Sequence, residues 1–176
     1  MLHMRPYQPE DAEHILSWIK NEYAFRQWSA DRYERYPAMP EDMNRLYAGA
    51  KDFYPMTAYD ESGVVGHLTM RFPTDEKNEL RFGFVIVDDA KRGCGYGKDM
   101  LNMALFYAFC VARVDRVSLA VFENNEAAYG CYRSAGFREV EVEETEAYHV
   151  MGETWNCREM QLQQDEWRMR LWSSSK

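Results

Sequence analysis

Cysteine and histidine are scarce in this chain of 176 residues. The four cysteines, at positions 94, 110, 131 and 157, contain no Cys-x-x-Cys pair, so the usual zinc and disulfide signatures are absent. The four histidines show neither His-x-x-x-His nor His-Glu-x-x-His spacing, the patterns that place metal ligands on one helix face. We therefore expect reduced thiols, as in a cytoplasm, and no bound metal.

Long apolar runs are also missing. No stretch approaches the roughly 18 continuous apolar residues that a membrane-spanning helix needs. The first residues, Met1 to Pro6, have neither the apolar core nor the small-residue cleavage site of a signal peptide. The hydrophobic content of 46% suffices for one buried core, and the chain is too short for two ordinary domains. The sequence predicts a single soluble, cytoplasmic domain over residues 1–176, without a membrane partner.

Positively charged residues are fewer than negatively charged ones: the chain has 21 lysines and arginines and 29 acidic residues, which gives a net charge of −8. Binding a nucleic-acid backbone requires a basic face, so we expect no nucleic-acid partner. Lys91, Arg92 and Lys98 nevertheless cluster, whereas residues 138–166 hold nine acids against two bases. These two regions of opposite charge fit a protein that binds an anionic cofactor beside a cationic co-substrate. The alternative is that the acidic region is only the solvated face of a strand, in which Glu139 and Glu141 alternate with valines.

The cluster belongs to a basic glycine-rich loop, Lys91–Lys98, between a strand-like run, Leu80–Asp88, and an apolar helix-like run that starts near Asp99. Glycines let backbone amides approach a ligand, and a helix start adds unpaired N–H groups and a positive dipole end. The loop is therefore predicted to cradle a diphosphate. It fits neither the Walker pattern nor the Gly-x-Gly-x-x-Gly dinucleotide pattern, and Asp99 stands where a Walker loop has a hydroxyl.

Two motifs together identify a family resemblance. Arg92–Gly97 reads Arg-Gly-Cys-Gly-Tyr-Gly, and Asn125–Phe137 fits Asn-x-x-Ala-x-x-x-Tyr-x-x-x-Gly-Phe. The first resembles the acetyl-CoA pyrophosphate loop of the GNAT superfamily of N-acetyltransferases, and the second resembles the segment after that family's fifth strand. The matched region, Leu80 to Phe137, covers about a third of the chain.

The hydrophobic pattern along the chain agrees with the α/β GNAT fold, which has a mixed, mostly antiparallel sheet of about seven strands flanked by helices. The resemblance further implies that the fourth and fifth strands splay apart. The expected elements are a strand at 2–7, a helix starting near residue 11, short helices within 22–50, a hairpin of Phe53–Tyr59 and Val64–Phe72, a strand at Leu80–Val87, a helix from near Asp99, a strand at Val117–Phe122, a helix capped by Asn124 or Asn125 and ended by Gly136, and late strands near Phe137–Tyr148 and Thr154–Gln163.

The resemblance implies acetyl-CoA as donor and assigns its contacts. Pantetheine would pair with backbone groups of Val85 and Val87, like an added strand, and an amide near Val87 would face the developing oxyanion. Asn125 has two interpretations: it only caps a helix, or it caps the helix and also contacts the pantetheine arm of the cofactor. The pyrophosphate would be held by the loop residues Arg92, Gly93, Cys94, Gly95, Tyr96, Gly97 and Lys98.

Tyr132 falls at the family's tyrosine position, where its hydroxyl would protonate the departing thiolate as general acid. The alternative is that Tyr132 is only a buried aromatic anchor of its helix. Glu79 opens the fourth strand and either deprotonates the amine through water or is a solvated strand-end residue. Strict alternation would place it on one side of the strand with Arg81, Gly83, Val85 and Val87. Glu22 and Asp31 are further candidates for the base.

The resulting hypothesis is an N-acetyltransferase that moves an acetyl group from acetyl-CoA directly to a primary amine of a small molecule or peptide N-terminus. The alternative is a non-catalytic acyl-CoA-binding or sensing domain. The lack of a base in the middle of the fourth strand favours this alternative, whereas the presence of Tyr132, which is useful only for chemistry, argues against it. The tail from Trp155 to Trp172 either seals the core or forms a homodimer contact, and exposed tryptophans would favour the contact.

Overall fold

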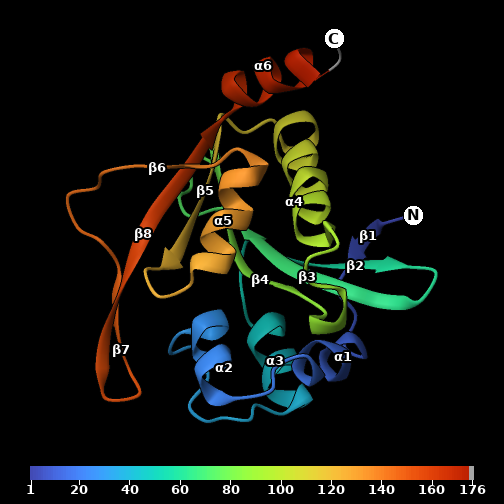
Figure 1. Ribbon diagram of the computed structural model, residues 1–176, viewed down its shortest axis with the longest axis vertical. Helices are drawn as coiled ribbons and strands as arrows, with labels where there is room; N and C mark the ends of the chain where they lie inside the picture. The colour runs from blue at the N-terminus through green and yellow to red at the C-terminus, as the bar shows by residue number, and fades with distance from the viewer. Residues whose placement is uncertain (175–176) are drawn as a thin grey trace.

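The computed structural model describes residues 1–174 as an open mixed sheet with helices on both faces (Figure 1). The strand order is β1-β2-β3-β4-β5-β8-β6, and β7 pairs with β8. The strands are β1 (His3–Pro6), β2 (Phe53–Asp60), β3 (Gly63–Arg71), β4 (Glu79–Val87), β5 (Arg116–Phe122), β6 (Arg138–Glu139), β7 (Ala147–Val150) and β8 (Glu153–Gln163). The helices are α1 (Asp11–Ser17), α2 (Glu22–Ser29), α3 (Pro40–Ala48), α4 (Tyr96–Phe106), α5 (Glu126–Ala135) and α6 (Gln164–Ser174).

Each face of the sheet carries its own hydrophobic core. Under α4 and α5 the core includes Leu101, Phe109 and Phe137, which are almost completely buried. Under α1, α2 and α3 a second core gathers around Ile15 and Phe25. Helices therefore cover the sheet on both faces (Figure 1), and β4 contributes side chains to both cores.

Local signals in the sequence account for several boundaries. Asn125, one of the two predicted caps, accepts a hydrogen bond from the Ala128 N–H at 3.2 Å and starts α5. Gly136 ends that helix with φ of +113°, a conformation that favours glycine. In the predicted β2–β3 hairpin, the Asp60 carboxylate accepts from the Ser62 N–H at 2.7 Å, which stabilises the turn.

The C-terminal third differs from expectation. The predicted strand at Phe137–Tyr148 is broken into β6 and β7, with residues 140–146 irregular between them. The exposed acidic run and the 38% exposed Val142 leave no buried face for a continuous strand. The polar tail forms α6 and packs Trp167 into the core, whereas Trp172 is 80% exposed. The homodimer contact stays a prediction.

No helix within residues 1–174 is long and apolar enough to cross a membrane. No group of three or more His, Cys, Asp or Glu side chains in the same range is placed to hold a metal ion.

His67 is fully buried on β3, where its Nε2 lies 2.8 Å from the Tyr47 hydroxyl. Burial lowers the pKa of this imidazole to about 3. In the unfolded chain a histidine titrates near pH 6.5, so below that pH the unfolded state binds a proton that the folded state does not. The stability that neutral His67 contributes is therefore complete above pH 6.5 and is lost progressively between pH 6.5 and about 3.

We predict that the free energy of unfolding falls by about 1.4 kcal/mol between pH 7.5 and pH 5.5 from this one group. Urea unfolding at the two pH values measures the change. An NMR titration should show the His67 ring neutral down to pH 5, because the folded-state pKa lies well below that value. A ring that titrates near pH 6.5 in the folded protein would contradict the prediction.

Candidate functional site

Strands β4 and β5 run parallel but separate after three residue pairs. Glu79–Arg81 pairs with Arg116–Ser118, and no later pair joins the two strands within the described chain. Beyond that point β5 keeps its pairing with β8 as far as Phe122, while β4 stays paired with β3. The splay implied by the family resemblance is therefore present, and it leaves one edge of β4 open to an extended ligand.

A β-bulge lies on β4 beside this opening. The pairing with β3 moves from Thr69–Gly83 to His67–Ile86, so two residues of β4 face one of β3. At the bulge Phe84 has φ of +48°, which is rare for a bulky residue. The Trp28 indole on α2 donates to the Phe84 carbonyl at 2.9 Å and thereby holds the bulge in place.

The bulge changes which side chains of β4 face each layer. Strict alternation would put Val85 and Val87 on the same side as Arg81, and this prediction is wrong. Both valines pack against the core under α4 and α5, together with Phe82, whereas Ile86 packs against the core under α1, α2 and α3. One inserted residue shifts the period-2 pattern by one position.

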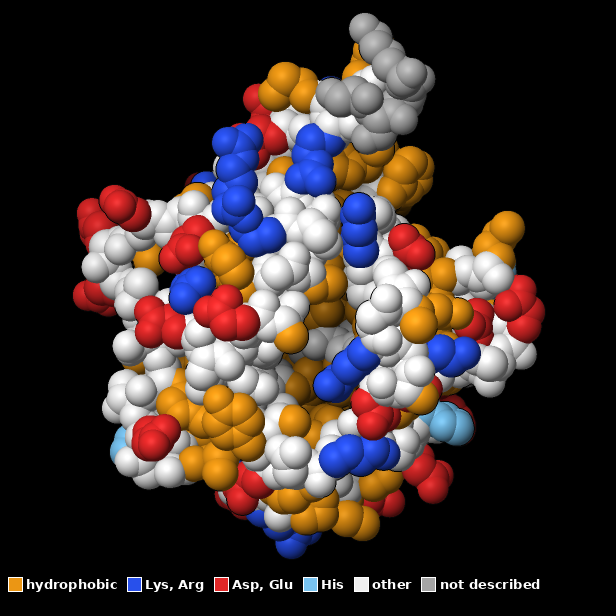
Figure 2. All heavy atoms as spheres, viewed as in Figure 1, with side chains coloured by type: hydrophobic (Ala, Val, Ile, Leu, Met, Phe, Trp, Pro, Cys, Tyr) orange, Lys and Arg blue, Asp and Glu red, His pale blue; other side chains and the backbone are white. Residues whose placement is uncertain are grey.

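A cavity of about 1040 Å³ fills the gap between the strands. Figure 2 shows it as a hollow with hydrophobic side chains in its depth and Lys and Arg side chains beside it. The cavity extends from the loop before α4, past β4 and α5, to residues of α2 and β3. Most of the predicted site residues line the cavity, namely Val85, Val87, Arg92, Gly93, Gly95, Tyr96, Gly97, Lys98, Asn125 and Tyr132. Cys94 and Glu79 do not line it.

The loop before α4 and the first turn of that helix present backbone N–H groups that have no acceptor. The helix begins at Tyr96, earlier than predicted, and its first bond joins the Asp99 N–H to the Gly95 carbonyl at 3.0 Å. Within residues 1–174, no acceptor is bonded to the N–H groups of Gly93, Gly95, Tyr96, Gly97 and Lys98. Such groups, together with the positive end of the helix dipole, form a natural phosphate site.

Glycine is required in this loop by its backbone. Gly93 and Gly95 have φ of +75° and +89°, which strains any residue with a Cβ. Gly97 is favoured by packing instead, because a Cβ there would lie 3.0 Å from the Cys131 Sγ on α5, a tight contact that would require the thiol to shift. Cys94 is exposed and lies outside the cavity lining, with its N–H 3.4 Å from the Lys91 carbonyl.

Tyr96 anchors the loop to the β2–β3 hairpin. Its hydroxyl donates to the Asp60 carboxylate at 2.6 Å, and Lys91 lies 3.9 Å from the same carboxylate. Hydrogen bonds from Ser62 and then Tyr96 lower the pKa of Asp60, so it stays ionised. The Tyr96 ring is thus used for positioning, and its backbone N–H remains available to a ligand.

Tyr132 lies on α5 with its side chain 93% buried, since only 7% of its surface is exposed. It lines the cavity and contacts Phe137 through their rings, whose centroids are 6.3 Å apart. Burial raises the pKa of its phenol above the ordinary value of 10. The phenol is therefore protonated at neutral pH, and the residue lines the cavity in the gap between β4 and β5.

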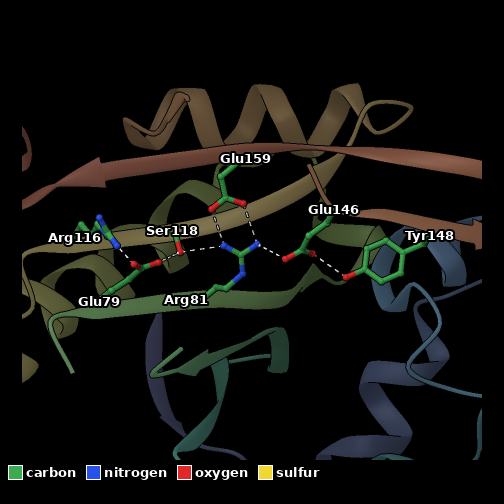
Figure 3. Close-up of polar contacts among 7 residues, drawn as sticks. All are labelled: Glu79, Arg81, Arg116, Ser118, Glu146, Tyr148 and Glu159. Atoms are coloured by element: carbon green, nitrogen blue, oxygen red, sulfur yellow. Dashed lines mark hydrogen bonds and ion pairs between the residues drawn. The ribbon is translucent and has the colours of Figure 1, made fainter. Parts of the chain in front are cut away.

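Glu79 is placed differently from the expected base. Its carboxylate accepts from Arg116 Nε at 2.6 Å and from the Ser118 hydroxyl, both on β5 (Figure 3). It lies at the closed end of the splay, buried, and does not line the cavity. Both sequence interpretations miss this ion pair between strands, and we do not retain Glu79 as a base. Glu22 and Asp31 do not line the cavity either, and Glu22 pairs with Arg26 at 3.3 Å.

Arg81 and Glu146 were not predicted as site residues, yet both line the cavity. Arg81 donates to both oxygens of Glu159, at 2.7 and 3.0 Å, and to Glu146 at 3.0 Å (Figure 3). Glu146 also accepts from the Tyr148 hydroxyl at 2.8 Å. Glu146 comes from the irregular segment before β7, so no strand or helix pattern in the sequence could have placed it.

Two cysteines line the cavity, but neither is activated. Burial raises the pKa of the Cys131 thiol, and burial followed by the charge of Glu146 raises that of Cys157 to about 12. The reactive form of cysteine is the thiolate, which these environments disfavour. The site therefore offers no prepared thiol nucleophile among its described cavity-lining residues.

Known proteins are similar to this chain in sequence and in fold. The family model described as "Acetyltransferase (GNAT) family" matches residues 14–137. The structure of spermidine N-acetyltransferase from Vibrio cholerae in complex with CoA and spermine superposes with a TM-score of 0.78 at 19% identity, over 95% of this chain and 98% of that one. A candidate phosphinothricin N-acetyltransferase gives a TM-score of 0.73 at 20% identity, over 93% and 99% of the two chains. The chain belongs to the acetyltransferase (GNAT) family of acyltransferases.

Proposed function

We propose that the protein transfers an acetyl group from acetyl-CoA directly to a primary amine. The observation that carries this proposal is the set of five free N–H groups in the loop before α4 and in its first turn, next to the gap between β4 and β5. A diphosphate at the N–H groups would leave the rest of an extended donor to follow the open edge of β4. Only a ligand with an anionic end and a long narrow arm uses both features.

The loop and β4 would bind different parts of acetyl-CoA. The N–H groups of Gly93 to Lys98 would hold the pyrophosphate, aided by the charges of Arg92 and Lys98. The open edge of β4 at Val85 and Val87 would pair with the amides of pantetheine. Asn125 both caps α5 and lines the cavity, so it would touch the arm as it passes.

In the chemical step the neutral amine nitrogen attacks the thioester carbonyl, and the carbon–sulfur bond breaks as the amide forms. Tyr132 would donate its proton to the departing thiolate and recover one from the attacking nitrogen through water. The proton lost by the amine thus ends on the thiol of CoA. Burial raises the pKa of the phenol, and the same desolvated site raises the basicity of the thiolate, which keeps donor and acceptor matched.

Direct transfer is favoured over an acyl-enzyme intermediate. The pKa values of Cys131 and Cys157 are both raised, and Cys94 lies outside the cavity lining. An acyl-enzyme would require a thiolate beside the thioester.

Isothermal titration tests the donor site first. A Gly95→Glu variant introduces a carboxylate among the free N–H groups, and its affinity for acetyl-CoA should fall at least about tenfold. Because Gly95 also has a positive φ, the control is Gly152→Glu, whose glycine has φ of +79°, open space around it and no place in the cavity lining. The control should bind like the wild type. A folded wild-type protein that does not bind acetyl-CoA would overturn the proposal.

The acid role is tested by Tyr132→Phe. This variant should lower kcat by about 100-fold or more, with KM for acetyl-CoA nearly unchanged, because it removes only the proton donor. The control is Tyr129→Phe on the same helix, since the Tyr129 hydroxyl bonds Glu139 at 3.1 Å and the residue does not line the cavity. An unchanged kcat in Tyr132→Phe would remove it from the mechanism. Donor binding without acetylation of any amine would indicate an acyl-CoA sensor.

A further inference from the structure

Three arginines line the part of the cavity that lies away from the phosphate loop. Arg71 ends β3 and pairs in register with Arg81 near the start of β4, and Arg32 lies in the segment that follows α2. Val87, which leads into the loop, is six residues further along β4 than Arg81. At about 3.3 Å per residue, Arg81 and its register partner Arg71 therefore lie roughly 20 Å from the phosphate end.

The guanidinium of Arg81 is occupied by hydrogen bonds and ion pairs within the protein. Its guanidinium bonds Glu159 through two hydrogen bonds, and it also bonds Glu146 and the Ser118 hydroxyl (Figure 3). Glu146 in turn accepts from Tyr148. The two carboxylates that face the cluster are therefore both committed to Arg81.

The guanidinium of Arg71, by contrast, has no such partners within residues 1–174. Its side chain is half-buried in the cavity wall and makes no hydrogen bond or ion pair with any residue in 1–174. The same holds for the guanidinium of the exposed Arg32. Burial, followed by the positive charges of Arg81 and Arg32, lowers the pKa of Arg71, while Glu146 and Tyr148 act in the opposite direction. The two largest charge effects on Arg71 thus come from positive groups.

A half-buried guanidinium without a partner is costly, and the cost is removed when an anion occupies the site. The planar fork of arginine matches a carboxylate, with two parallel hydrogen bonds. The same cluster repels a second positive charge. The acceptor end of this cavity therefore suits an amine that also carries an anionic group, and it is poorly suited to a polyamine.

The distances suit a small acceptor. Thr69, two residues before Arg71 on β3, pairs with Gly83 at the bulge, where the gap between β4 and β5 is open. About 7 Å of strand thus separates Arg71 from the gap. The flexible arginine side chain can cover part of this distance, so one small molecule can place its amine at the gap and its carboxylate on Arg71.

We propose that the acceptor is an amino acid or a similar amino-carboxylate, whose carboxylate binds Arg71 with help from Arg32. This inference rests on the proposed acetyl transfer and names the substrate class of that same site. Arg71 acts here as a specificity-determining residue and takes no part in bond making.

The test uses matched pairs of acceptors that differ only in the carboxylate. L-Methionine is compared with 3-(methylthio)propylamine, L-phenylalanine with phenethylamine and L-lysine with cadaverine, with spermidine as the polyamine. In at least one pair the amino acid should have the higher kcat/KM by tenfold or more, and spermidine should be a poor acceptor. Arg71→Gln should remove that preference while leaving KM for acetyl-CoA unchanged.

The control variant is Arg45→Gln on α3, whose side chain is 79% exposed and does not line the cavity. It should keep the preference of the wild type. Equal or better use of the decarboxylated amines or spermidine would overturn the inference while supporting acetyl transfer. Absence of turnover with every amine would instead count against the proposed function.

A binding measurement judges the anion site without turnover. In CoA-saturated protein, N-acetyl-L-methionine should bind more tightly than N-acetyl-3-(methylthio)propylamine by titration calorimetry, and Arg71→Gln should remove the difference. Equal binding of the two probes to the wild type would overturn the site even if acetylation were observed with other amines.

Discussion

The parting of β4 from β5 is the constraint on which the rest of the molecule depends. Where the two strands part, each keeps only the neighbour on its other side, β3 for β4 and β8 for β5, so the backbone groups on the edge of β4 that faces the gap are left for a ligand. The closed end of the splay is held by side chains: Glu79 and Arg81 on β4 reach Arg116 and Ser118 on β5 (Figure 3). This polar connection fixes the point at which the strands separate, and thereby the position of the cavity.

The electrostatic arrangement follows from the same geometry. The chain is acidic overall, but positive groups gather at two places in the cavity. At one end stand the free N–H groups and the basic residues of the loop before α4, and at the other stand Arg71 and Arg32. Between them lie apolar side chains and the phenol of Tyr132. A donor with a diphosphate and an acceptor with a carboxylate would meet between two anion-binding ends.

The sequence predicted the elements whose signals are local. The loop at Arg92–Gly97, the cap at Asn125 and the stop at Gly136 depend on residue type and near neighbours, and the structure confirms their local conformation. The bulge at Phe84 carries no such signal, because an aromatic residue gives no hint of a positive φ. Arg71 and Glu146 could not be predicted as neighbours either, since only tertiary packing brings them to one cavity.

The hydrogen bond from Trp28 to the Phe84 carbonyl places an indole in the wall of the cavity, at the bulge where the two substrates would meet. Indole emission depends on the polarity and hydrogen bonding of its surroundings. Trp28 therefore reports on this junction, and its share of the emission from the five tryptophans of the chain would change as the cavity fills, without any added label.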